Sequence, residues 1–303
     1  MSQAFDYLLS GLCLRSEIPL PELVPAPETA KPAEVRVRLA ETPKALEKPV
    51  DSGVLYEAAP GQFLLHMPGI AHYFARNGEE IIVEPETGSL AAEVRLFLLG
   101  TVWAALMHQR ELLVLHASGI RTSLGAVIFI GRSSVGKSSL AAAFYRQGYP
   151  VLGDDVMVVK VNDERALAYP GFPQLHVWPD MLYALEVPPA EVTPLRPKLA
   201  KRVLATPIGF TSEPQPVKAI YVLQFTNNEE ELKLEHFQGM ARFSVLLNNT
   251  FREKFLGGLG VRPAHFHQVN GVARSVPVAS LTRPEQPPQL ERMVEMIKED
   301  LGL

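Results

Sequence analysis

Apolar and polar residues alternate along the first ninety residues with the period of two that is typical of half-buried β-strands. The segment 35–39 alternates valine and leucine with arginine, and the segment 63–67 carries apolar side chains at every second position. Asn77-Gly78 stands between two further runs and predicts a two-residue hairpin, because both residues tolerate positive φ. No catalytic constellation accompanies these runs, so we predict a β-rich accessory or recognition domain over residues 1–90.

The pattern changes near residue 90. Apolar residues at helical spacing predict a largely buried helix within 94–107. Two strands follow at 112–116 and 126–130, and the second is almost wholly apolar, which is typical of a strand covered on both faces. A helix is expected over 137–147, with Gly148 as the residue that ends it.

The rest of the chain gives a less regular pattern. Further along it predicts, in chain order, a hairpin of 156–161 and 165–169 across Asn162-Asp163, a loop over 169–179, an irregular basic segment over 188–207, a strand over 217–226, an amphipathic helix over 241–256, a strand over 274–282 and a terminal helix over 290–300. A hairpin directly after the loop-bearing unit is unlike a repeated βαβ pattern. We therefore predict a mixed α/β (α+β) sheet in a second domain spanning residues 91–303.

Composition and charge narrow the function classes. The chain has 303 residues, of which 47% are hydrophobic and 20% charged, with a formal net charge of -4. That charge argues against nucleic acid or an anionic membrane as the main partner, since both require many cationic contacts. Cys13 is the only cysteine, which excludes an intramolecular disulfide and a multi-thiolate metal site. The N-terminus lacks the features of a signal peptide and the apolar run 94–107 is short of a membrane span, so a cytoplasmic protein is expected.

The strongest motif is GRSSVGKS at 131–138, which matches the phosphate-binding pattern G-x-x-x-x-G-K-[ST] between an apolar strand and a helix. In this pattern the backbone N–H groups cradle phosphates, the lysine reaches the β- and γ-phosphates, and the serine hydroxyl ligates Mg²⁺. We therefore expect ATP and Mg²⁺ as cofactors. The residues expected to bind the nucleotide are Gly131, Ser133, Ser134, Val135, Gly136, Lys137, Ser138 and Ser139.

Three further features could serve a triphosphate site. Asp154-Asp155 follows a short apolar strand, and two carboxylates could divide the tasks of metal ligand and base; alone, Gly-Asp-Asp would be a solvated turn. His116 ends the strand before the loop-bearing strand, and is either a catalyst or an ordinary core group. A basic set could meet an acidic peptide, a carboxylate or the transferring phosphoryl group, or could be a solvated loop. That set is Arg196, Lys198, Lys201 and Arg202.

Two other features carry no predicted function. His265 and His267 lack a third ligand nearby, which argues against a metal site. Trp178 and the aromatic residues of FREKFLGG at 251–258 are expected to be core side chains.

The segments LHASGI and AVIFIGRSSVGKSSLAAAFYRQGYPVLGDDV resemble the catalytic domain of the HPr kinase/phosphorylase family. They are most similar to the HPr-kinase-related proteins encoded beside ribosomal and lasso-peptide biosynthesis genes. The specific core spans residues 115–156, and a weaker likeness runs through YPGFPQLHVWPD, PLRPKLAKR and FREKFLGGLG. The first ninety residues look like those of the related kinases and not like the N-terminal domain of true HPr kinases.

The resemblance implies a fold shared with ATP-dependent phosphoenolpyruvate carboxykinase. It also implies that His116 lies near the γ-phosphate, that Asp154 is the base for the accepting serine hydroxyl, and that Asp155 acts with Ser138 at the Mg²⁺ site. The chain departs from the family at two positions: Ser134 replaces a usual glycine, and Ser139 replaces a glutamate. A match to the family's second conserved segment is also missing, which speaks against phosphorylase activity.

The leading hypothesis is an ATP- and Mg²⁺-dependent kinase that phosphorylates a serine hydroxyl of a peptide or protein, with the C-terminal residue of a ribosomal (lasso) precursor peptide as the specific candidate. Two alternatives stay open: a kinase for a small molecule such as free serine, and a non-catalytic nucleotide-binding switch. HPr kinases form hexamers, so a homo-oligomer is compatible with the resemblance without being carried over by it.

Overall fold

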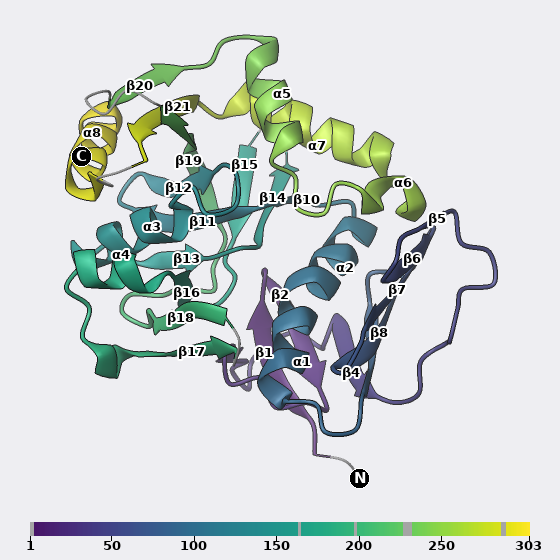
Figure 1. The fold of residues 1–303 in the computed structure, drawn as a ribbon. Helices are drawn as coiled ribbons and strands as arrows, with labels where there is room; N and C mark the ends of the chain where they lie inside the picture. The colour runs from purple at the N-terminus through teal and green to yellow at the C-terminus, as the bar shows by residue number, and fades with distance from the viewer. Residues whose placement is uncertain (1–2, 163–164, 197–198, 227–231, 286–288) are drawn as a thin grey trace. The chain divides into compact units, whose positions relative to one another are not determined.

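The computed structural model describes residues 3–162, 165–196, 199–226, 232–285 and 289–303 (Figure 1). The chain folds as two compact units, each described here by itself. The first unit combines Met1–Val114 with Thr250–Gln268, and the second combines Leu115–Asn249 with Val269–Leu303. This division differs from the expected boundary after residue 90, because the helices that follow residue 90 pack on the strands of the first unit.

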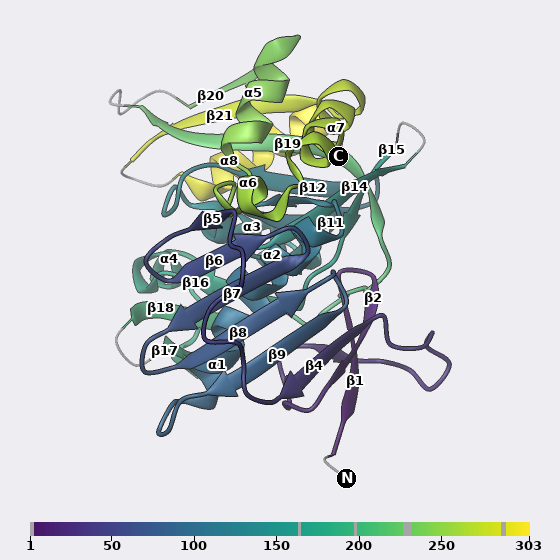
Figure 2. The ribbon, with the colours of Figure 1, turned by 90° about the vertical axis from the view of Figure 1, so that its right-hand side faces the viewer.

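The first unit is built on one mixed sheet with the strand order β3-β1-β2-β4-β9-β8-β7-β6-β5 among the described residues (Figure 2). Its strands are β1 (Phe5–Leu9), β2 (Leu12–Ser16), β3 (Val24–Pro25), β4 (Val35–Leu39), β5 (Asp51–Ser52), β6 (Tyr56–Ala59), β7 (Gln62–Met67), β8 (Ala71–Arg76) and β9 (Glu80–Pro85). Strand β4 pairs in parallel with β2 and β9, and the other pairs are antiparallel.

The hairpin predicted at Asn77-Gly78 joins β8 to β9. Asn77 and Gly78 adopt φ values of 55° and 68°, as the turn chemistry predicts. Arg76 pairs with Glu80, however, so three residues rather than two connect the strands. The third residue is Glu79, whose N–H donates to the Arg76 carbonyl at 3.1 Å and extends the turn by one position.

One face of this sheet carries a continuous helical segment, formed by α1 (Ala91–Phe97), a π-helical turn (Leu98–Val102) and α2 (Trp103–Gln109). Helix α2 contacts β7, β8 and α6 (Phe255–Leu259). The segment Ala91–Gln109 is long and apolar enough to cross a membrane, yet 61% of it is buried inside the protein. Trp103 is 2% exposed, and its indole N–H donates to Ser10 Oγ at 3.1 Å. These contacts support the prediction of a buried core helix.

The second unit contains a mixed sheet in which β12 (Gly125–Ile130) and β21 (Val278–Pro284) both run parallel to β19 (Gln215–Thr226). The remaining pairs are antiparallel and involve β11 (Ala117–Thr122), β13 (Val151–Gly153), β14 (Met157–Asn162), β15 (Arg165–Tyr169) and β20 (Lys233–His236). Strand β10 (Leu113–Leu115) lies where the chain passes from the first unit to the second. The expected strand 112–116 is thus shorter than predicted.

Helices α3 (Lys137–Arg146) and α8 (Leu290–Leu301) pack together over one face of this sheet (Figure 1). The side chains that meet them alternate along the strands, as with Val127 and Phe129 on β12. Ile128 and Ile130, which point to the opposite face, are also fully buried. The prediction of a strand covered on both faces is therefore confirmed, and Gly148 has the left-handed φ of 90° expected after α3.

Several sequence predictions for residues after 168 were wrong. The expected loop 169–179 contains β16 (Gln174–Val177), and the expected irregular segment 188–207 contains β17 (Val192–Arg196) and β18 (Leu199–Ala205), which form a three-stranded sheet in the order β16-β18-β17. The other helices of this part are α4 (Pro179–Ala184), the 3₁₀ turn Pro189–Glu191, α5 (Met240–Asn248) and α7 (Arg262–Ser275). The helix expected over 241–256 breaks after Asn248, where Arg252 adopts a φ of 57°. The strand expected over 274–282 begins only at Val278, because α7 runs to Ser275.

Candidate active site

The GRSSVGKS segment connects the buried strand β12 to helix α3. Gly131 and Gly136 have φ values of 139° and 106°, and a Cβ on Gly131 would lie 2.6 Å from the Leu223 carbonyl oxygen. Ser134 stands at a φ of 65°, the left-handed conformation that glycine adopts most readily. Helix α3 begins without a side-chain cap at Gly136, so the amides of its first turn are directed toward the loop without intrahelical acceptors. This arrangement suits an anion.

Lys137 lies under the loop. Its Nζ donates to the carbonyl oxygens of Gly131 and Arg132, both at 3.0 Å, and the residue is 5% exposed. Burial lowers the pKa of Lys137 to about 8, against the raising effect of Asp154 and Asp155. Within the described part of the chain the ammonium group donates to these two neutral carbonyls, so a phosphate would be a favourable charged partner.

Asp154 accepts three hydrogen bonds in the polar network beside the GRSSVGKS loop. Its Oδ1 accepts hydrogen bonds from Ser118 Oγ at 2.5 Å and Ser138 Oγ at 2.9 Å, and its Oδ2 accepts from the backbone N–H of His176 at 2.8 Å. Burial raises the pKa of Asp154, and the charge of Asp155 raises it further. Ser138 is thus bonded to Asp154, while Ser138 and Asp155 both line the same pocket, and their joint role at a Mg²⁺ site stays a prediction.

The side chain of Asp155, the next residue, makes a different set of contacts from that of Asp154. It adopts a left-handed φ of 62°, and its Oδ2 lies 2.8 Å from His176 Nδ1. Its backbone carbonyl accepts a 3.1 Å hydrogen bond from Nδ1 of His116, which fixes the ring of that histidine. Burial by itself raises the pKa of Asp155, but the hydrogen bond and charge of His176 and the charge of Lys201 lower it overall.

The pKa values of His116 and His176 are shifted in opposite directions. Burial and the nearby charge of Lys137 lower the pKa of His116. Burial also opposes protonation of His176, but the hydrogen bond to Asp155 and the charges of both aspartates raise its pKa overall. The result is a His176–Asp155 ion pair that closes one side of the site.

A small pocket brings most of the predicted residues together, and Asp155 rather than Asp154 opens into it. The residues that line it are His116, Ser133, Ser134, Gly136, Lys137, Ser138, Ser139, Asp155, His176, Trp178 and Lys201. Val135 is 2% exposed and belongs to the core, and its expected part in nucleotide binding, through the backbone of the loop, stays a prediction. Trp178 was expected in the core, but it is half-buried at the pocket, with Lys201 Nζ 5.7 Å from its ring centre.

The basic set separates in the structure. Of the three members that the structure describes, Lys201 alone lines the pocket. Arg202, its neighbour on β18, donates to the Ala200 carbonyl at 2.8 Å, and Arg196 lies on β17. Lys198 is outside the described residues.

Three residues of the network were not predicted from the sequence. Ser118 stands two positions after His116, so the period of a strand could have placed both on one face. His176 lies in a segment that was expected to be a loop, and no local pattern marks it. Arg283 on β21 is 5% exposed and donates to the Val135 carbonyl at 3.0 Å, which supports the loop from behind.

The chain was compared with known protein families, curated proteins and solved structures. No family model matches the chain, and no curated protein matches it. Among solved structures, the Hpr(Ser) kinase/phosphatase from Coxiella burnetii is similar over 62% of this chain and 97% of its own, with 12% sequence identity and a TM-score of 0.32. At that TM-score the likeness carries no argument about fold or function, which must come from the geometry of the site.

Proposed function

We propose that this protein is an ATP- and Mg²⁺-dependent kinase that transfers the γ-phosphoryl group to a serine hydroxyl of a peptide or protein. One observation carries the proposal. The loop between β12 and α3 presents an uncapped helix N-terminus, a buried lysine, and a serine hydrogen-bonded to a buried aspartate within one constellation. Phosphoryl transfer depends on positioning and charge stabilisation of this kind.

The triphosphate would bind along the first turn of α3. Its β- and γ-oxygens would accept hydrogen bonds from the amides of the loop, and Lys137 would move from the Gly131 and Arg132 carbonyls to the phosphates. Phosphate charge raises the pKa of a neighbouring lysine, so Lys137 stays fully cationic when nucleotide is bound. His116, fixed by the Asp155 carbonyl, would stand beside the terminal phosphate.

The residues around Ser138 fit a hard divalent cation. Ser138 Oγ and Asp154 Oδ1 are oxygen donors 2.9 Å apart, and Mg²⁺ is usually held by one or two such protein oxygens together with phosphates and water. When bound, Mg²⁺ offsets charge on the β- and γ-phosphates. Ser118 and the His176 amide hold the carboxylate of Asp154 in place for this task.

The geometry favours Asp155 as the proton acceptor. Both oxygens of Asp154 already accept hydrogen bonds, whereas Asp155 lines the pocket in which an acceptor hydroxyl would lie. The serine oxygen would form the new bond to phosphorus as the bond to the ADP oxygen breaks, and the serine proton would pass to Asp155. Two observations favour the original assignment of Asp154 as the base: burial raises the pKa of Asp154, and the ion pair with His176 lowers the pKa of Asp155. We give access to the substrate more weight, because a base must reach the proton that it accepts.

Trp178 and Lys201 line the pocket, and we assign them to the side on which the acceptor would bind. An aromatic face with a lysine ammonium near it would suit a peptide segment that bears a carboxylate. Together with the sequence resemblance, this supports a serine at or near the C-terminus of a precursor peptide as the acceptor.

The test is mass spectrometry of candidate acceptors after incubation with Mg²⁺-ATP. The panel holds peptides ending in serine, HPr protein and free serine, and each is treated with the wild type and with Asp155→Asn. A gain of about 80 Da on a peptide, dependent on Asp155, supports the proposal. A gain on free serine alone would make the protein a small-molecule kinase. Nucleotide binding without transfer to any acceptor would favour the switch module instead.

A further inference from the structure

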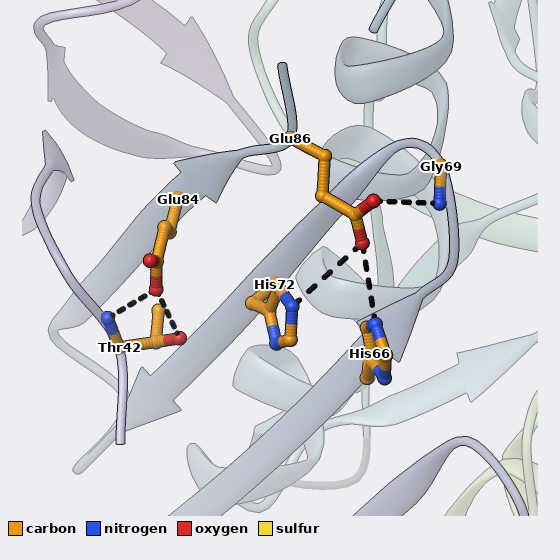
Figure 3. A network of polar contacts seen from close by, with 6 residues as sticks. All are labelled: Thr42, His66, Gly69, His72, Glu84 and Glu86. Atoms are coloured by element: carbon orange, nitrogen blue, oxygen red, sulfur yellow. Dashed lines mark hydrogen bonds and ion pairs between the residues drawn. The ribbon is translucent and has the colours of Figure 1, made fainter. Parts of the chain in front are cut away.

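A second cluster of ligand-type side chains lies on the sheet of the first unit and takes no part in the proposed kinase reaction. His66 on β7 and His72 on β8 are directly paired across the two antiparallel strands, and Glu86 follows the end of β9. Figure 3 shows the two imidazole rings side by side, with the Glu86 carboxylate directed at both of them.

The three side chains converge on a common point. His66 Nε2 lies 3.2 Å and His72 Nε2 lies 3.7 Å from the same oxygen, Oε1 of Glu86. Ligand atoms bound to one tetrahedral Zn²⁺ at about 2.0–2.1 Å are about 3.3 Å from each other. The two distances to Glu86 bracket that value, and all three ligand atoms lie within 4.8 Å of one another. The two rings are stacked, with centres 3.9 Å apart and an interplanar angle of 13°, so at least one ring would turn to direct its Nε2 lone pair at a shared ion.

The carboxylate is held in position by the backbone around it. Glu86 Oε2 accepts the N–H of Gly69 at 3.0 Å (Figure 3). The Glu86 amide donates to the Ile70 carbonyl at 3.0 Å. Gly69 makes this turn with a left-handed φ of 74°. Because Oε2 is engaged by Gly69, Oε1 is the oxygen turned toward the histidines, and the carboxylate ligand is held in place by the backbone.

The cluster is accessible and lies in an acidic setting. The side chains of His66, His72 and Glu86 are 47%, 33% and 34% exposed. Glu84, the cross-strand partner of His72, adds a second carboxylate that is fixed by the amide and hydroxyl of Thr42 at 2.8 and 2.9 Å. An ion can therefore reach the site, and a positive charge there is favoured.

We propose that His66, His72 and Glu86 bind a divalent transition-metal ion, with Zn²⁺ as the ion that fits best and a fourth coordination position open to solvent. Two imidazole nitrogens and one carboxylate oxygen suit Zn²⁺ and its neighbours in the series, whereas Mg²⁺ and Ca²⁺ select oxygen ligands. The site is therefore chemically distinct from the Ser138–Asp154 pair. It would tie β7, β8 and the end of β9 together on one face of the sheet.

The experiment measures Zn²⁺ binding to the metal-free full chain by competition with a chromogenic chelator, in excess Mg²⁺ so that oxygen-ligand sites are occupied. His66→Gln, His72→Gln and Glu86→Gln test the ligands. His236→Gln is the matched control, since His236 pairs with Asp300 at 2.7 Å without a third ligand in the described residues. Asp155→Asn is the second control, because Asp154, Asp155 and His176 form the other ligand cluster found among those residues.

We expect one Zn²⁺ per chain in the wild type and in both controls, and at least about tenfold weaker binding in each ligand variant. Co²⁺ bound to the wild type should give the visible absorption of a tetrahedral site, and this absorption should be absent in His72→Gln. Since the three side chains are partly exposed, the variants should match the wild type in thermal stability without metal. Zn²⁺ binding that survives all three ligand substitutions, or that is lost only in Asp155→Asn, would overturn the proposal, and so would a wild type that binds no Zn²⁺.

Discussion

The hydroxyl of Ser138 donates a 2.9 Å hydrogen bond to Oδ1 of Asp154, which joins the first turn of α3 to the end of β13. The two residues are sixteen positions apart in the sequence, and the rest of α3 and the strand β13 lie between them along the chain. The contact places a hydroxyl and a carboxylate where one cation could use both. It also leaves Asp155 as the aspartate that faces the pocket.

Substitution of Ser138 tests the contribution of its hydroxyl group to Mg²⁺ binding. We expect Ser138→Ala to raise the Mg²⁺ concentration needed for half-maximal phosphoryl transfer by about tenfold or more, because a cation ligand and a donor to Asp154 are both lost. Ser138→Thr keeps the hydroxyl and should stay close to the wild type. The measurement is a magnesium titration at fixed ATP. Equal requirements for magnesium in the alanine variant and the wild type would refute a role for this hydroxyl.

Substitution of Asp154 and of Asp155 should affect different steps, nucleotide binding and turnover respectively. Asp155→Asn should lower turnover by about 10²–10⁴-fold and leave nucleotide binding nearly unchanged, since it removes only the proton acceptor. Asp154→Asn should weaken Mg²⁺-nucleotide binding, because an amide cannot accept the bonds from Ser118, Ser138 and the His176 amide equally well. Single-turnover kinetics and binding measured on both variants check this. The reverse pattern would restore Asp154 as the base.

Arg283 supports the loop from behind. Its guanidinium donates to the carbonyls of Val135, Pro284 and Glu285, and it lies 4.6 Å from the ring centre of Phe225. Arg283→Lys cannot keep this fork of bonds, so we expect a loss of roughly 1–3 kcal/mol in the free energy of unfolding and weaker ATP binding.

Arg292→Lys is the control for that substitution, because Arg292 is exposed on α8 and makes a single side-chain bond to Gln289. Denaturant unfolding and nucleotide titration of both variants give the answer. If both lysine variants behave alike, Arg283 has no special part in holding the loop.

His108 should make the first unit sensitive to acid. It is 1% exposed, its Nε2 lies 2.8 Å from the Phe251 carbonyl, and burial lowers its pKa to about 4. Above pH 6.5 the ring is neutral in both the folded and unfolded chains. Between pH 6.5 and 4 only the unfolded chain takes up the proton. The free energy of unfolding therefore decreases as the pH is lowered through this window, by up to about 3 kcal/mol. Below pH 4 this loss is complete.

The measurement is urea unfolding at several pH values, followed by the fluorescence of Trp103 in a Trp178→Phe background, since the chain has two tryptophans. His108→Gln should flatten the pH dependence. His267→Gln, which changes an exposed histidine of α7, should leave it as it is. An unchanged slope in His108→Gln would contradict the assignment.

Much of the local structure around the site was predictable. The strand 126–130, the glycine-rich loop and the start of α3 follow from an apolar run, a motif with fixed glycines, and helical periodicity, all of which act over a few residues. The cluster of His116, Lys137, Ser138 and Asp155 was expected because these residues flank consecutive elements.

The remaining contacts depend on pairing between distant segments. His176 meets both aspartates only because β16 runs beside them, and that strand was hidden in a segment rich in proline and aromatics. The helix expected over 241–256 failed for another reason: periodicity reports which side chains are buried and not whether the helix is continuous. The expected helix is interrupted near Arg252, where the chain passes from the second unit to the first.

The His66–His72–Glu86 cluster was missed for a similar reason. The histidines are six positions apart and Glu86 is further along, so no spacing in the sequence suggests a shared ligand set. Only the antiparallel register of β7, β8 and β9 brings them together.

The central claim is that the loop between β12 and α3 binds the terminal phosphates of ATP, and calorimetric titration of Mg²⁺-ATP into the wild type and Lys137→Met tests it most directly. Methionine keeps the buried stem and removes the charge. The account predicts that the variant binds Mg²⁺-ATP at least about tenfold more weakly, a loss of about 1.4 kcal/mol, while AMP binds equally weakly to both proteins. Equal affinity of the two proteins for Mg²⁺-ATP, or a wild type that does not distinguish ATP from AMP, would contradict it.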